Sequence, residues 1–151
     1  MNSADWSQRQ GHRLIQIGCF LFLVALLVGI MVPSFAVPRL GLSTHLLGIT
    51  QGIFLMVIGL VWPRLRASRP IGTAGMFLVL YGCFAPWTAN LLAAILGAGN
   101  ALLPLAAGSA QGTSLQEGII AILLRSGAVS LIAALLLILW GLRGVNDTQE
   151  S

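Results

Sequence analysis

The chain has 151 residues, of which 57% are hydrophobic and 8% are charged, and its formal net charge is +4. A soluble domain carries about a quarter charged residues, so this composition excludes an ordinary soluble domain and indicates a protein embedded in lipid. All eight basic residues are arginine and form no patch that alternates with aromatic residues, so we expect no nucleic-acid partner. Cys19 and Cys83 both lie in apolar segments, so we expect neither a structural disulfide nor a cysteine metal site.

Four apolar segments are each long enough to cross a bilayer, which takes about 20 residues of helix. We expect transmembrane helices over residues 14–36, 45–63, 71–97 and 115–142. The predicted fold is therefore all-α, an integral membrane four-helix bundle that forms a single domain over residues 1–151. The first segment is too long to be the apolar part of a cleaved signal peptide.

The arginines are divided unequally between the two sides of such a bundle. One side carries Arg39 alone, and the other carries Arg9, Arg13, Arg64, Arg66, Arg69 and Arg143. The positive-inside rule then predicts a multi-pass protein of a bacterial-type inner (plasma) membrane with both termini in the cytoplasm. The uncharged segment 97–114 would lie on the opposite side, either as a lid folded onto the helix ends or as a loose connector.

The second span begins with a histidine beside a row of glycines. At about 100° per residue, Gly48, Gly52 and Gly59 lie within roughly 60° of His45 on the helix surface. A metal ligand beside bare backbone suits a planar cofactor, and the same glycines equally suit a closely packed helix. His12 would lie on the other side of the membrane, so a metal held by His45 would keep an open position for ligand binding or Lewis-acid chemistry.

Polar groups are costly in hydrocarbon, so those within the spans need an explanation. In the second to fourth spans these are His45, Gln51, Tyr81, Trp87, Asn90, Glu117 and Arg125. Four of them fall in the predicted non-cytoplasmic half: His45, Asn90, Glu117 and Arg125. Their common depth favours one shared site, whereas a local bond between helices explains each one separately, and Arg125 can reach the interface by snorkelling. Pro86 frees a backbone carbonyl, which either a neighbouring helix satisfies or a kink turns into a wider cavity.

Short blocks along the chain follow a recognisable pattern. They are Gly41-Leu-Ser-x-His45, Gln51-Gly52-x-Phe54-Leu55, Gly59-Leu-x-Trp62-Pro63-x-Leu65-Arg66, Tyr81-Gly82, Gln116-Glu117 and Leu139-Trp140-Gly141-Leu142-Arg143. Together they resemble the hydroxylaminobenzene mutase family over about residues 14–143. The resemblance implies a small membrane isomerase that converts an aryl hydroxylamine such as hydroxylaminobenzene to an ortho-aminophenol in nitroaromatic degradation. Gln51 and Pro86 depart from the pattern, since each stands where Asn is expected.

The spacing of His45, Gln51 and Gly52 is also similar to that of the styrene oxide isomerase family, which has Asn in place of Gln51. This second resemblance implies that His45 is the axial metal ligand of a ferric haem b, which acts as a Lewis acid on the substrate oxygen. It fits the glycine row, so we expect His45, Gly48 and Gly52 to bind the cofactor. It further implies a homo-oligomer, which is a trimer in that family.

The expected reaction moves a hydroxyl group from nitrogen to the ring in a pocket that excludes water. We expect Tyr81, Asn90 and Glu117 to be catalytic, and Gln51, Trp87 and Asn90 to bind the substrate. The expected partners are a small aromatic hydroxylamine, membrane lipid and further copies of the chain. Two other functions fit a small membrane protein: a transporter, for which the first span lacks a carboxylate, and a haem-bearing electron-transfer anchor, for which a second axial ligand is missing.

Overall fold

The computed structural model describes residues 3–143, and this part of the chain is helical without a strand. Its four long helices are α1 (Ser3–Met31), α2 (Pro38–Val61), α3 (Arg69–Leu96) and α5 (Ser114–Leu142). A short helix, α4 (Pro104–Ala107), lies between α3 and α5, and the 3-10 turns η1 (Val32–Ser34) and η2 (Trp62–Arg64) follow α1 and α2. The predicted all-α class is confirmed.

The four long helices have the length and apolarity needed to cross a membrane. The shortest of them, α2, has 24 residues. At about 1.5 Å per residue this is roughly 36 Å, against about 30 Å of hydrocarbon. α1 begins at Ser3 rather than residue 14, and α2 begins at Pro38 rather than residue 45. Apolarity marks the part of a helix that lipid can cover, whereas backbone signals such as a proline at the first helical position set where the helix starts.

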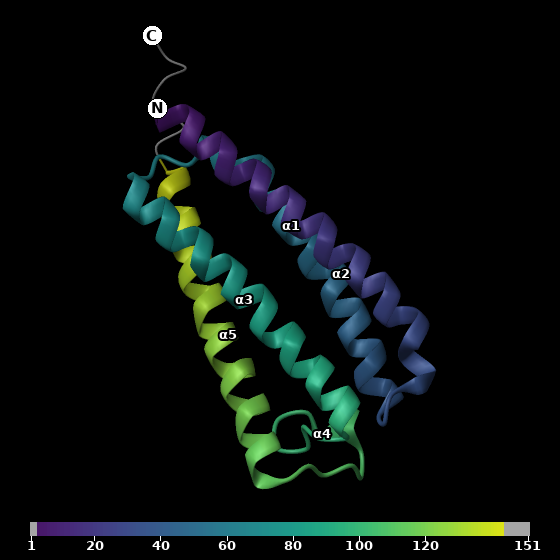
Figure 1. Ribbon diagram of the computed structural model, residues 1–151. Coiled ribbons are helices and arrows are strands. Elements are labelled where there is room, and N and C mark those ends of the chain that lie inside the picture. Colours follow the sequence, from purple (N-terminus) through teal and green to yellow (C-terminus); the bar gives the residue numbers. More distant parts are fainter. Residues whose placement is uncertain (1–2, 144–151) are drawn as a thin grey trace.

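The long helices form two antiparallel hairpins. Figure 1 shows α1 lying along α2 and α3 lying along α5, with the start of α1 and the end of α5 at one end of the molecule and α4 at the other. α2 packs against α3 and thereby joins the hairpins, while α1 makes little contact with α3. The α2–α3 interface is therefore the place where polar groups from both hairpins can meet.

Glycines bring α1 and α2 into close contact. A Cβ atom at Gly52 would lie 2.9 Å from the carbonyl oxygen of Gly18, and one at Gly59 would lie 2.6 Å from that of Gly11. Such backbone approach is typical of helix pairs with small residues at the crossing. Of the two uses predicted for the glycine row of the second span, the structure shows the packed helix.

Pro86 lies inside α3 without ending it. Its ring packs on α5, because a Cβ atom at Gly127 would lie 2.6 Å from Pro86 Cδ. One turn earlier in α3, a Cβ atom at Gly82 would lie 2.9 Å from the backbone of Leu131. Of the two outcomes predicted for Pro86, a neighbouring helix or a wider cavity, the α3–α5 contact shows the neighbouring helix.

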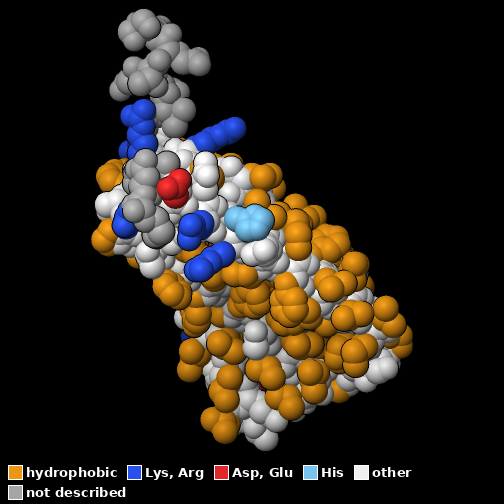
Figure 2. Space-filling view, turned by 45° about the horizontal axis from the view of Figure 1, so that its top comes forward, with side chains coloured by type: hydrophobic (Ala, Val, Ile, Leu, Met, Phe, Trp, Pro, Cys, Tyr) orange, Lys and Arg blue, Asp and Glu red, His pale blue; other side chains and the backbone are white. Residues whose placement is uncertain are grey.

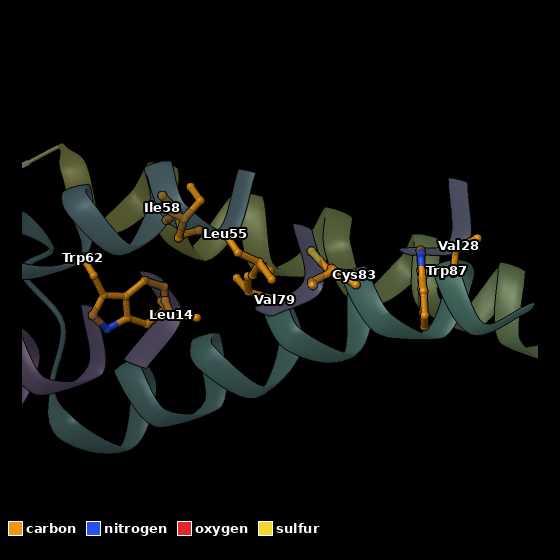
Figure 3. Packing of buried hydrophobic residues seen from close by; sticks show 11 residues of the cluster. Leu14, Val28, Leu55, Ile58, Trp62, Val79, Cys83 and Trp87 are labelled. Carbon is orange, nitrogen blue, oxygen red and sulfur yellow. The ribbon is translucent and has the colours of Figure 1, made fainter. Parts of the chain in front are cut away.

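The core runs along the α2–α3 interface and is completed by α1. Figure 3 shows Leu55, Val79, Cys83 and Trp87 in a row, with Val28 of α1 beside Trp87. Figure 2 shows hydrophobic side chains over most of one face and arginines gathered at the end where α1 begins. Because this face is apolar and most of the arginines lie at one end, the molecule suits a bilayer.

Candidate active site

The imidazole of His45 is half-buried and is held by α1. Its Nδ1 atom lies 2.7 Å from the carbonyl oxygen of Ala25. A carbonyl oxygen only accepts hydrogen bonds, so Nδ1 carries the hydrogen and donates it, and the lone pair on Nε2 stays available. A Cβ atom at Gly29 would lie 2.5 Å from Nδ1, so the ring fits only because residue 29 is glycine. The sequence pattern identified His45 but not Ala25 or Gly29, which position it from another helix.

Trp87 and Gln51 place two unpaired polar atoms in the core. The indole Nε1 of Trp87 and the amide Oε1 of Gln51 are buried and have no hydrogen-bond partner. An unpaired buried group costs about 1–3 kcal/mol, so this donor and this acceptor are candidates for hydrogen bonds to a polar ligand. A Cβ atom at Gly48 would lie 2.5 Å from Trp87 Nε1 and 2.6 Å from Ala25 Cβ. The indole nitrogen thus lies where α1, α2 and α3 meet. It is close to Ala25, the residue whose carbonyl oxygen holds His45.

Asn90 lies one turn beyond Trp87 on α3 and connects α3 to α2. Its Nδ2 donates to the carbonyl oxygen of Pro86 at 3.0 Å, and its Oδ1 accepts from Ser43 Oγ at 3.3 Å. The side chain is 5% exposed. Asn90 therefore borders the same interface as Trp87, and the hydrogen bond from Ser43 was not predicted.

Tyr81 lies on a different face of the molecule. Its side chain is 45% exposed, and its hydroxyl is 2.7 Å from Ser126 Oγ of α5. Together with Arg125 and Ser130 it lines an open groove of about 490 Å³ on the outside of the α3–α5 hairpin. The structure thus does not bring Tyr81 to Asn90 and Trp87, and the catalytic role predicted for it has no support in this geometry.

Glu117 belongs to the connection between α3 and α5. Residues 97–113 form this connection, which we call the strap. The Glu117 carboxylate accepts backbone N–H groups of the strap from Gly99 at 2.7 Å, Asn100 at 3.2 Å, Ala101 at 3.1 Å and Gly112 at 3.1 Å. All four partners are donors, so the carboxylate holds the strap together and does not face Trp87 or Asn90. The lid alternative for this segment, rather than the loose connector, agrees with this folded arrangement.

The predicted site residues therefore separate into two groups. His45, Gly48, Trp87 and Asn90 lie around the junction of α1, α2 and α3, and Gln51 is buried about one turn from Gly48 on α2. Tyr81, Glu117 and Arg125 lie elsewhere. Gly52 packs against Gly18 and Phe22 of α1. Depth in the membrane predicts which residues share a level, but not which helix face they occupy, so the single shared site was only partly correct.

The comparison with known proteins gives the class of this small helical membrane-type protein. The profile of the family described as styrene oxide isomerase matches residues 10–143, and the chain belongs to this family.

Two curated relatives are hydroxylaminobenzene mutases from Ectopseudomonas oleovorans. The chain is 46% identical to hydroxylaminobenzene mutase HabB over 140 residues, which are 93% of this chain and 85% of HabB. It is 39% identical to hydroxylaminobenzene mutase HabA over 129 residues, which are 85% of this chain and 96% of HabA. No solved structure matches the chain. The protein is thus an intramolecular isomerase of the mutase type, which confirms the resemblance and favours an enzyme over a transporter or an electron-transfer anchor.

Proposed function

We propose that this enzyme converts an aryl hydroxylamine to an ortho-aminophenol by moving the hydroxyl group from nitrogen to the neighbouring ring carbon. The observation that carries the proposal is the 46% identity to a hydroxylaminobenzene mutase over 93% of the chain. The buried and unpaired Trp87 Nε1 of α3 and Gln51 Oε1 of α2 support it, because they suit a substrate group that both accepts and donates hydrogen bonds.

Ferric haem b with His45 as its axial ligand is the cofactor that we propose. The side chain fits this role, because Nδ1 is occupied by the Ala25 carbonyl and Nε2 remains free to ligate. Within residues 3–143 no three metal-ligating side chains lie together, and a haem needs few protein ligands because the porphyrin supplies the equatorial nitrogens. When bound, the haem supplies a Lewis-acidic metal toward the substrate oxygen. Gly48 and Gly52 are covered by Trp87 and α1 in a single chain, so we assign them to packing and not to cofactor contact.

The chain's own residues bind the substrate and exclude water. The Trp87 N–H donates to the hydroxylamine oxygen, and the Gln51 carbonyl oxygen accepts from the substrate N–H. Asn90 is fixed by Pro86 and Ser43 and therefore forms a rigid wall of the site. In the net reaction the N–O bond breaks, a C–O bond forms at the ortho carbon, and a proton is lost from that carbon while one is gained at nitrogen. No electrons are exchanged with another molecule.

The location that we propose is a bacterial-type inner membrane, with both termini and the arginine-rich end in the cytoplasm. The arginines at one end of the molecule support this orientation. Large apolar side chains such as Ile30, Leu60 and Phe77 are well exposed, which supports contact with lipid or with further copies of the chain.

The test is turnover of hydroxylaminobenzene by the purified enzyme in mild detergent, with absorption spectra of the wild type, His45→Ala and Gln51→Met. We expect ortho-aminophenol without added electrons, and a Soret band that is lost in His45→Ala and kept in Gln51→Met. Gln51→Met removes an unpaired buried oxygen, so its turnover should fall while its thermal stability stays equal or rises. A haem-supplied wild type without a Soret band would remove the cofactor from the proposal, and a wild type without turnover would remove the substrate.

A further inference from the structure

The strap closes the end of the molecule that lies opposite the arginine-rich end. Figure 1 shows α4 and the flanking segments passing between the ends of α3 and α5. The strap is folded by its own hydrogen bonds as well as by Glu117: Asn100 Nδ2 donates to the carbonyl oxygen of Gly108 at 2.9 Å. A capping box joins its last residue, Thr113, to Gln116 of α5. It is therefore a defined element and not a chain of arbitrary shape.

The Glu117 carboxylate is the centre of this element. Three consecutive N–H groups, from Gly99, Asn100 and Ala101, point at the carboxylate from one end of the strap, and that of Gly112 does so from the other end. Consecutive N–H groups that converge on an anion need unusual backbone angles, and Gly99 supplies them with φ of 103°. Hydrogen bonds to an ionised group are about twice as strong as neutral ones, so one side chain ties both ends of the strap to α5.

The inner side of the strap covers the bundle. Ala98 and Ala107 of the strap are almost fully buried, and they share one apolar cluster with Leu40 of α2 and Ala93 of α3. A Cβ atom at Gly99 would lie 3.2 Å from Ala93 Cβ, so the strap lies directly on α3. Asn90 is one turn deeper on the same helix. The strap thus covers the ends of α2 and α3 next to Asn90, which borders the polar junction.

We propose that Glu117 is a positioning residue, and that the strap it holds is a water seal that keeps the oxygen transfer intramolecular. The inference rests on the proposed function. It adds that the strap selects which of two products the reaction gives. Glu117 does not touch the substrate in this scheme. It acts by keeping the strap on the apolar cluster, and so it decides whether water reaches the ring once the N–O bond weakens.

The two products differ in position and in the source of their oxygen. In the sealed enzyme the substrate's own oxygen moves to the ortho carbon, and a proton moves from that carbon to nitrogen. In a leaking enzyme the hydroxyl group takes up a proton and leaves as water, and a solvent water adds to the para carbon. The added water and the para carbon each lose one proton, and the nitrogen gains one, which gives para-aminophenol. Both routes balance without an oxidant or a reductant, since one water enters and one leaves in the second.

The experiment compares wild type, Glu117→Gln and the strap control Ser109→Ala in ¹⁸O-labelled water. A glutamine has one acceptor oxygen instead of two and no charge, so we expect amide hydrogen exchange at residues 99–101 and 112 to become about tenfold faster. We also expect labelled oxygen and para-aminophenol to appear in the product of Glu117→Gln, with the Soret band unchanged. Ser109 is exposed and outside these bonds, so Ser109→Ala should behave as wild type.

Asn100→Ala is a second variant in case Glu117→Gln does not fold. It removes only the side-chain hydrogen bond to Gly108. Amide exchange and product composition should change in the same direction as in Glu117→Gln, but by a smaller amount. Faster amide exchange in Glu117→Gln with an unchanged product would overturn the role of the strap as a water seal. Unchanged exchange would overturn the role of Glu117 in holding the strap. If wild type does not turn over, the proposed function fails separately. The water seal is then tested with Ala93→Cys in a chain that also carries Cys19→Ser and Cys83→Ala, so that residue 93 is the only cysteine. The rate at which a charged thiol reagent labels this cysteine is compared with and without Glu117→Gln. Faster labelling with Glu117→Gln supports the seal, and equal labelling overturns it.

Discussion

The chemistry available to His45 is decided by two residues of another helix. Ala25 accepts the Nδ1 hydrogen at 2.7 Å, and Gly29 leaves room for the ring. The sequence identifies His45, Gln51, Trp87 and Asn90, because polar residues are conspicuous in apolar spans. It does not show that the Gln51 and Trp87 atoms lack partners, since pairing depends on which atoms other helices bring near.

At the scale of single residues, Gly29→Ala should disturb His45, the proposed haem ligand, while His45 itself is unchanged. The added carbon would lie 2.5 Å from His45 Nδ1, so the ring must turn away from the Ala25 carbonyl. Loss of such an orienting bond typically weakens metal binding about 10–100-fold. Haem titration of the purified variant should therefore show weaker retention and a shifted Soret band. Gly118→Ala is the matched control, because nothing lies within 4 Å of the added carbon; equal haem affinity in the two variants would contradict the assignment.

At the scale of the helices, the glycines of α2 that suggested a cofactor site are used for helix packing. The row of Gly48, Gly52 and Gly59 is filled by α1 and Trp87, so its function in one chain is close helix contact. Hydropathy located the four long helices, but not the starts of α1 and α2 or the short α4, which depend on local backbone signals and on contacts of the strap.

Gly52→Val should therefore destabilise the α1–α2 hairpin. A Cβ atom there would already lie 2.9 Å from the Gly18 carbonyl oxygen, and a valine adds two further methyl groups. Overpacking of this kind costs typically about 1–3 kcal/mol. Thermal unfolding in detergent should show a lower midpoint than for wild type. Gly118→Val, at an open position of α5, should unfold close to wild type; if both variants unfold alike, the close crossing is not important for stability.

For the whole molecule, the distribution of arginine determines the predicted orientation. With the arginine-rich end in the cytoplasm, a fluorescent protein fused to the C-terminus should be fluorescent, because it folds on that side. An alkaline phosphatase inserted after Ser109 in the strap should be active, because that enzyme folds only outside the cytoplasm. The reverse pattern would invert the orientation and place the proposed water seal on the cytoplasmic side.

The sequence by itself determined the four long apolar helices, the family and the polar residues His45, Gln51, Trp87 and Asn90, and it predicted a lipid environment. These follow from composition and local pattern, because the cost of a polar group in hydrocarbon does not depend on its neighbours along the chain. Only the tertiary structure decided that Glu117 holds the strap, that Tyr81 bonds to Ser126 on an outer face, and that α1 covers the glycine row. Each of these depends on rotation about a helix axis and on the register between helices, which are set by contacts between residues far apart in the sequence.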